Sequence, residues 1–421
     1  MRTYARLLVL GVAVMVTGCT ATPQSTPTPD PSATERSAPS ASPTPSATPK
    51  PTKKPPAAPK LDAELVADGF AAADDKPIAV TDSGVVFAGP DKIAYLMGAD
   101  GTQQWRLPRQ LNLGDADEPR TIDHVAGSFG EGPADLIAAD YRCDAVDCIG
   151  ANEYGVAGFS TEDGDLQWSR SISGDEGPIA VADVTEDAVI VELRTSDEEQ
   201  RAITAFDSDS GDRLWTLSGY AASWVSGDHV LAQRVDGPDL EDWTPVVVDL
   251  ESGEVVLTSE HRGSWRRPEV DLYESAEDLA AIAVRPGEGD TTSPHTVLVD
   301  LVEEREYELT DGFQALGSLG RDSDGAYFAW PGQESGTVLS SGLPIRAPKV
   351  GESADLDQFG NLRAATGRYL WFESATSTTA IDRTGARRLD PVEGTVRAVT
   401  GDWLVTETDG LNVYRLTPDR R

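Results

Sequence analysis

From residue 61 onward, hydrophobic residues come in short runs that are separated by polar turn residues, as at residues 188–193 and 246–250. Runs of this length bounded by Gly, Asp and Ser are typical of β-strands. No long stretch has a convincing 3.6-residue apolar period, and the best helical candidate, residues 278–284, also fits a strand. The pattern therefore predicts an all-β domain over residues 61–421.

A turn signature recurs among these runs, in which a glycine precedes a large apolar residue by four positions. Its fullest copy is AFDSDSGDRLW, with Ala205, Asp207, Gly211 and Trp215. Because side chains alternate faces along a strand, a fixed offset from the turn places each apolar residue on the same face. We expect these residues to pack between neighbouring sheets. The glycine and apolar residues of the units are Gly101 and Trp105, Gly164 and Trp168, Gly211 and Trp215, Gly253 and Leu257, and Gly385 and Leu389.

The spacing of the units predicts a β-propeller, since repeats of about 42 to 50 residues accommodate four strands each. We expect eight four-stranded blades, or seven if the weak unit near Gly336 is only an insertion. Three strands after residue 395 lack an outer partner, and residues 63–70 can supply it. An N-terminal strand would then close the ring and remove the exposed sheet edges.

The signature resembles the repeat of the PQQ-like (quinoprotein dehydrogenase-like) β-propellers, Ala-x-Asp-x-x-x-Gly-x-x-x-Trp. Ala205, Asp207, Gly211 and Trp215 match it fully, and the other units match it in part. The resemblance covers about residues 65–416. It implies an eight-bladed propeller with tryptophans docked between blades. Many relatives of this family are non-catalytic scaffolds, including the lipoprotein subunit of the outer-membrane protein assembly machine.

The pattern of the N-terminal residues predicts a targeting segment. Arg2 and Arg6 precede a short apolar stretch, and Gly18-Cys19 follows in a context that resembles a bacterial lipobox. We expect residues 1–18 to be a lipoprotein signal peptide and Cys19 to be lipidated; an ordinary secretory signal is the alternative. Residues 19–60 are rich in Pro, Ser and Thr and predict a disordered tether. The protein is therefore expected on the outer face of the cytoplasmic membrane, anchored by lipid.

Only Cys143 and Cys148 remain after Cys19. In an exported protein a lone close pair most simply forms a disulfide, which would stabilise the fold by roughly 2 kcal/mol. The nearest histidine, His124, is 19 residues upstream of Cys143, so a metal site there is not expected.

The net charge of −36 disfavours nucleic acid and anionic lipid headgroups as partners. One basic and aromatic cluster stands out on this acidic chain, formed by Arg262, Arg266 and Arg267 around Trp265. Trp and Arg are favoured at binding hot spots, so these four residues are candidate binding anchors. The alternative is a loop whose tryptophan covers the propeller rim.

No catalytic residue, cofactor or metal ligand is expected. The resemblance to quinoprotein dehydrogenases would imply adjacent cysteines and a calcium site with Glu and Asn ligands, and the chain has neither pattern. No HExxH or G-x-S-x-G motif is present. Residues 129–140 faintly resemble a calcium-binding turn of other propellers, but a plain strand-turn-strand is the preferred interpretation.

The leading hypothesis is a lipid-anchored envelope propeller that binds another envelope protein or a ligand and catalyses nothing. The first alternative is recognition of cell-wall carbohydrate through the propeller rim. The second is a PQQ-dependent dehydrogenase.

Overall fold

The computed structural model describes most of the propeller region, and all described residues belong to one compact unit, Pro55–Arg421. The predictions for Cys19, Cys148, Arg267 and Gly385 lie outside the described residues. The described ranges are 58–71, 74–91, 93–113, 119–127, 135–143, 154–172, 179–194, 201–237, 243–266, 272–273, 279–284, 295–308, 316–321, 327–331, 337–339, 360–366, 369–382 and 386–418.

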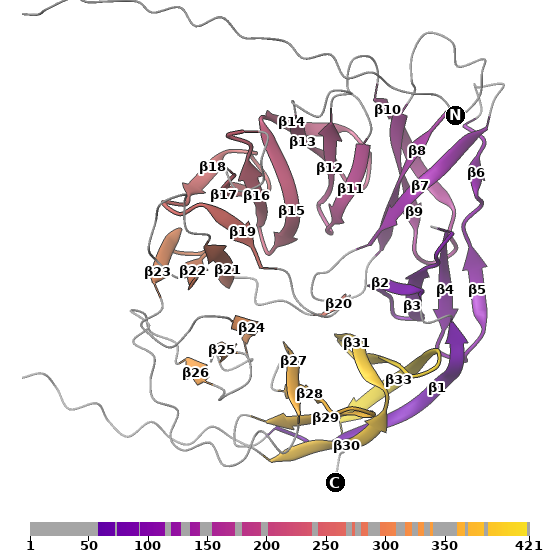
Figure 1. Cartoon of the computed structure of the whole chain (residues 1–421). Coiled ribbons are helices and arrows are strands. Elements are labelled where there is room, and N and C mark those ends of the chain that lie inside the picture. The colour runs from indigo at the N-terminus through magenta and orange to yellow at the C-terminus, as the bar shows by residue number, and fades with distance from the viewer. Residues whose placement is uncertain are drawn as a thin grey trace, which may run out of the picture. The chain divides into compact units, whose positions relative to one another are not determined.

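The described regular elements are all strands, and they form seven hydrogen-bonded sheets (Figure 1). The first three sheets are β2 (Lys76–Val80), β3 (Gly84–Ala88), β4 (Ala94–Gly98) and β5 (Gln103–Arg106); β6 (Gln110–Leu111), β7 (Arg120–Ala126), β8 (Leu136–Arg142), β9 (Tyr154–Ser160) and β10 (Leu166–Ile172); and β11 (Ile179–Val184), β12 (Ala188–Arg194), β13 (Arg201–Asp207) and β14 (Arg213–Ser218).

The next three sheets follow in chain order, except that β20 leaves its neighbours in the sequence and joins another sheet. They are β15 (Tyr220–Ser226), β16 (His229–Arg234), β17 (Thr244–Asp249) and β18 (Val255–Thr258); β19 (Gly263–Trp265), β21 (Leu279–Val284), β22 (His295–Asp300) and β23 (Arg305–Glu308); and β24 (Leu316–Arg321), β25 (Tyr327–Pro331) and β26 (Thr337–Leu339). The helical candidate at residues 278–284 is thus a strand, β21.

The seventh sheet joins two sets of four strands. Its order is β20 (Leu272–Tyr273), β31 (Thr395–Thr400), β32 (Trp403–Glu407), β33 (Leu411–Pro418), β1 (Leu61–Ala71), β30 (Arg387–Glu393), β29 (Ser377–Asp382), β28 (Tyr369–Glu373) and β27 (Asn361–Thr366). Because β1 links both sets into one sheet, the number of blades stays a prediction.

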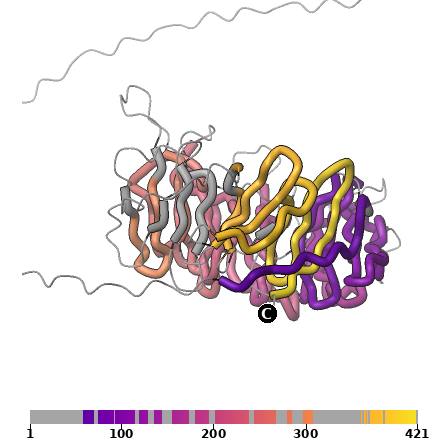
Figure 2. The backbone as a smooth tube through the Cα atoms, turned by 90° about the horizontal axis from the view of Figure 1, so that it is seen from below, coloured from indigo at the N-terminus to yellow at the C-terminus, as the bar shows by residue number. Residues whose placement is uncertain are grey.

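The N-terminal strand closes the ring, as the sequence predicts. β1 runs antiparallel to β33 from the pair Leu61 and Pro418 to the pair Ala71 and Leu411. Figure 2 shows this strand, in indigo, lying along the yellow C-terminal strands. The two ends of the propeller sequence therefore complete one four-strand set between them.

The hydrophobic core lies between consecutive sheets. One cluster joins β3 and β4 to β8 and β9, and another joins β12 and β13 to β16 and β17. A third packs Val405 and Val413 of the last strands against Phe87 of β3. This face-to-face stacking of short sheets in chain order is the packing of an all-β propeller. In the described part of the chain no helix is long and apolar enough to span a membrane.

Candidate functional site

Three tryptophans of the turn signature bridge consecutive sheets. The indole N–H of Trp105 donates to the carbonyl of Thr161 at 2.9 Å. The indole of Trp168 donates to Ser208 at 2.6 Å, and that of Trp215 to Leu250 at 2.8 Å. Each acceptor lies in the turn between the last two strands of the following sheet, namely β9 and β10, β13 and β14, or β17 and β18. Each tryptophan therefore ties its own outer strand to the next turn along the ring.

The glycine of that next turn lies directly beneath each indole ring. A Cβ atom placed on Gly164, Gly211 or Gly253 would lie 3.0, 2.5 or 2.6 Å from the nearest ring atom. The same three glycines have φ between +70° and +76°. Both the ring contact and the backbone conformation therefore require glycine. Gly101 differs, since its Cβ would instead meet the Val66 carbonyl oxygen of β1 at 2.6 Å.

The aspartate of the signature holds the turn in shape. Asp207 Oδ1 accepts a hydrogen bond from the Ser210 N–H at 2.7 Å, which lowers the pKa of this carboxyl. Asp249 accepts from the Ser252 hydroxyl at 2.6 Å and from the Ser252 N–H at 2.8 Å. The hydroxyl contact is the main cause of its lowered pKa. The side chains of the signature thus fold the turn and dock neighbouring sheets.

The prediction of Trp265 as a surface binding anchor is wrong. Its side chain is 6 % exposed, donates its indole N–H to the Ala232 carbonyl at 2.7 Å, and packs edge-on against Trp224. The reason is that Trp265 lies in a strand, β19, whose first and third residues face the core. Of the arginines around it, Arg262 is exposed and Arg266 is half-buried. Trp265 therefore joins sheets and is not available to a partner.

The innermost strands carry charged pairs that the sequence pattern does not reveal. Arg363 bonds Glu373 at 2.9 Å, and Arg397 bonds Glu407 in the same way. Each arginine occupies a bulge, where the innermost strand skips one pairing with the second strand. Asp123 occupies the bulge of β7 and pairs with Arg142 at 3.1 Å. In this pair the acidic residue lies on the inner strand and the arginine on the second strand. In the sequence, these bulge positions are marked by a single charged residue inside an apolar strand, as Arg397 is in TVRAVT.

A buried carboxylate lies beside these pairs in the second sheet. Asp140 accepts a hydrogen bond from the His124 N–H, and its Oδ2 lies 3.0 Å from His124 Nδ1. Burial raises the pKa of Asp140. Of residues 129–140, which faintly resemble a calcium-binding turn, residues 129–134 lie outside the described residues and residues 136–140 belong to β8. Among the residues that the structure describes, no group of three or more His, Cys, Asp or Glu is placed to hold a metal ion.

Of the two cysteines in the predicted disulfide, the structure describes only Cys143. The Arg120 guanidinium donates to the Cys143 sulfur at 3.0 Å. Because Cys148 lies outside the described residues, the bridge stays a prediction.

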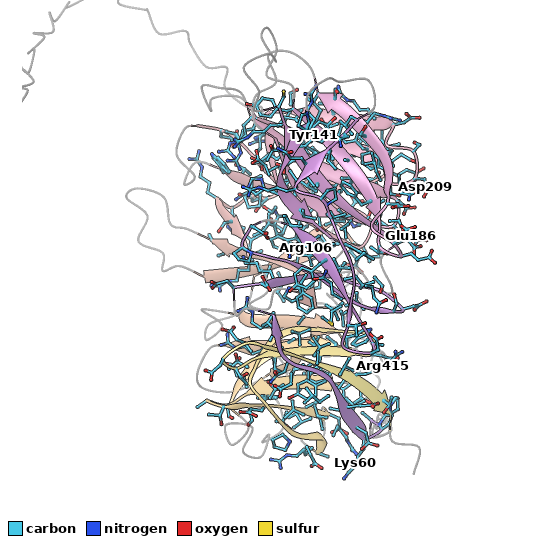
Figure 3. The ribbon with its side chains drawn as sticks, turned by 90° about the vertical axis from the view of Figure 1, so that its right-hand side faces the viewer. Lys60, Arg106, Tyr141, Glu186, Asp209 and Arg415 are labelled. Atoms are coloured by element: carbon cyan, nitrogen blue, oxygen red, sulfur yellow. The ribbon has the colours of Figure 1, made fainter. Side chains whose placement is uncertain are left out.

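The turns of the signature lie on one side of the sheets, which we call the turn rim. It consists of the turns between the third and fourth strands of each set of four strands together with the turns between the first and second strands, and in the second sheet this set is β7–β10. Within a sheet the two turns are hydrogen-bonded, as from Ser208 N to the Asp187 carbonyl at 3.1 Å and from Leu250 N to the Asp228 carbonyl at 2.9 Å. Figure 3 shows Glu186 and Asp209 projecting from the same side of the sheets. The tryptophan bonds described above link the rim across the first four sheets.

Comparisons with known proteins give one matching family. Residues 58–259 match the family described as outer membrane protein assembly factor BamB. A search of curated proteins finds no match.

Several solved structures are similar to this chain. BamB from Moraxella catarrhalis is 15 % identical and aligns over 85 % of this chain and 97 % of its own, with a TM-score of 0.45. The Dos1 propeller is 12 % identical over 85 % of this chain and 95 % of its own, with a TM-score of 0.47. The quinohemoprotein alcohol dehydrogenase ADHIIG from Pseudomonas putida HK5 is 12 % identical over 85 % of this chain and 76 % of its own, with a TM-score of 0.40.

Proposed function

Since the chain is a PQQ-like β-propeller repeat protein, we propose that it is a non-catalytic scaffold that binds another protein of the cell envelope. The observation that carries the proposal is the match of residues 58–259 to the family of an outer membrane protein assembly factor. That stretch runs from the segment before β1 to the end of β18, so it includes the three docked tryptophans. A factor of that name acts on other proteins, and we extend this role to the present chain.

The packing of the sheets supports a scaffold role. Each indole bond to the following turn, with the ring seated on a glycine, fixes the position of that turn relative to its neighbour. A surface that is already ordered loses little conformational entropy when a partner binds. The turn rim is therefore suited to protein binding without rearrangement.

The place of action in this proposal follows from the N-terminus. The lipobox at Cys19 and the Pro-rich tether that follows would hold the propeller outside the cytoplasmic membrane, connected to it by lipid. The net charge of −36 would keep the propeller away from anionic headgroups while the tether spans the gap.

Crosslinking of the full chain in intact cells tests the proposal. We expect one or a few defined envelope proteins to be recovered in covalent complexes, identified by mass spectrometry. The Cys19→Ser variant is the matched control, because it keeps the propeller and removes the lipid attachment. It should leave the membrane fraction and lose those complexes.

Two results would contradict the proposal and favour the alternatives. Turnover of a dye-linked alcohol substrate by the metal-checked full chain would show a dehydrogenase. Retention on purified peptidoglycan or arabinogalactan, with no protein crosslinked in cells, would show a carbohydrate-binding propeller.

A further inference from the structure

Exposed hydrophobic side chains occur on several sheets of the propeller, at or next to the turns of the signature. Among the described residues, the exposed large hydrophobic side chains are those of Leu65, Leu166, Leu214 and Val302, with exposed fractions of 48, 42, 47 and 74 %. Leu166 and Leu214 stand two and three residues after the turn glycines of their sheets, and Val302 lies in the corresponding turn of the fifth sheet. These three therefore lie on the turn rim.

Leu65 occupies the same place in the ring-closing strand. Ala67 of β1 pairs with Val413 and lies against Gly101, as Trp105 lies against Gly164 in the next sheet. Ala67 thus takes the place that the docked tryptophan has in the other sheets, and we call this place the docking position. Leu65 precedes Ala67 by two residues, as Leu166 precedes Trp168. Four separate sheets expose an aliphatic side chain at this level, although the propeller surface elsewhere in the described residues exposes none of comparable size.

The rim around these side chains is strongly acidic. Exposed arginines also occur there, at Arg213, Arg305 and Arg387, but carboxylates outnumber them. The exposed acidic residues of the rim are Asp82, Asp100, Asp135, Glu162, Asp163, Asp165, Glu186, Asp187, Asp209, Asp212, Asp228, Glu251, Glu254, Glu303, Glu304 and Asp402. An aliphatic side chain among carboxylates is complementary to a partner that carries both aliphatic and cationic side chains.

We propose that the turn rim is the docking surface for a basic protein segment with aliphatic side chains. The aliphatic side chains of the segment cover Leu166 and Leu214, which lie on consecutive sheets, and its lysines or arginines face the neighbouring carboxylates. This inference rests on the proposed scaffold function and names the class of partner. Charge selects this occupant, because an acidic segment, a nucleic acid or an anionic membrane is repelled by the same carboxylates.

Binding of synthetic peptides to the full chain tests the chemistry. The probe is a peptide of alternating lysine and leucine, with matched peptides that carry serine for leucine or glutamate for lysine. We expect the lysine–leucine peptide to bind best and its affinity to fall as salt is raised. The double variant Leu166→Ser, Leu214→Ser should weaken it about tenfold, since each leucine loses apolar contact area.

A matched variant keeps this test specific. Ser218 is exposed at the far end of β14, on the same strand as Leu214, and Ser218→Ala should leave peptide affinity unchanged. Thermal unfolding shows that each variant is folded. Equal binding of the lysine–serine peptide, or unchanged affinity in the leucine double variant, would overturn the inference.

A photocrosslinking residue introduced into the full chain in cells separates this inference from the proposed function. Crosslinks to an envelope protein from position 209 and not from position 218 support both. Crosslinks from position 218 alone would overturn the rim as the docking surface and leave the scaffold function standing. The absence of crosslinks from either position, together with the absence of any partner in the chemical crosslinking above, would remove both.

Discussion

At the scale of single residues, the side chain at each docking position limits the residue in the next turn. Tryptophan at 105, 168 and 215 is followed by glycine at 164, 211 and 253, because the ring occupies the space of a Cβ atom. The fourth unit carries the smaller Leu257, and the next turn holds Glu304 instead of glycine. Glu304 still has a φ of +50°, alone among the described non-glycine residues. The turn keeps its backbone shape, and the ring contact decides whether a side chain is tolerated.

Replacing Gly211 with alanine tests this coupling. We expect Gly211→Ala to lower the free energy of unfolding by about 2–4 kcal/mol, from overpacking against Trp168 and from the positive φ together. Urea unfolding of the full chain, followed by tryptophan fluorescence, measures the loss.

The control separates the two causes. Gly219 has a φ of +86°, but nothing lies within 4 Å of the position of its Cβ atom. Gly219→Ala should therefore cost only about 1 kcal/mol, from the backbone conformation alone. Equal losses in the two variants would show that the indole ring does not constrain the turn.

At the scale of elements, the turn between the third and fourth strands depends on an ionised aspartate. Asp249 has a pKa below its usual range because Ser252 donates its hydroxyl and its N–H to the carboxylate. A carboxyl with a lowered pKa in the folded state stabilises the fold above the unfolded pKa of about 3.9. That contribution is lost as the pH falls through the lower, folded-state pKa.

The variant Asp249→Asn should show this pH dependence. We expect it to be less stable than the wild type at neutral pH, and the two proteins to approach each other as the pH falls below about 4. Thermal unfolding across this pH range makes the comparison. Glu251→Gln removes an exposed charge from the same turn and should differ little from the wild type throughout. A constant gap between Asp249→Asn and the wild type at every pH would contradict the role of the ionised carboxylate.

The local pattern of the sequence was sufficient to predict the position of some elements and not of others. The Gly-x-x-x-Trp spacing predicts where the outer strands dock, since it depends only on a turn and strand alternation. It does not place Trp265, because the loop-like sequence around it hides the short strand β19. Nor does it place β20, which pairs in parallel with Ala398 and Val399 of a distant sheet. Pairings between remote segments, and the bulges that aim Arg363 and Arg397, depend on the register of neighbouring strands.

At the scale of the whole propeller, the strand that closes the ring is also the strand that follows the predicted tether. Just before β1, the Ala58 N–H donates to the buried carboxylate of Asp382 at 3.2 Å, and Arg388 bonds the same oxygen at 2.6 Å. The Pro59 carbonyl accepts from the Tyr369 hydroxyl at 3.2 Å. The chain is thus fastened to one four-strand set before it completes the next, so ring closure and attachment to the tether share one segment.

Removing β1 should therefore unfold the propeller and not leave a folded propeller that lacks one strand. Deletion of residues 61–71, with the tether joined to residue 72, exposes the edge of β33 and uncovers the clusters that contain Leu61 and Ala67. The loss should approach the whole free energy of unfolding, typically about 5–15 kcal/mol, and the exposed edge should favour association between chains. Circular dichroism in urea and size-exclusion chromatography measure the two effects.

Deletion of a similar length within residues 25–45 shortens the tether and leaves β1 in place, so it should unfold like the wild type. If the β1 deletion instead unfolds at the same urea concentration as this control and elutes as the same species, the propeller is closed by contacts other than the pairing of its two ends.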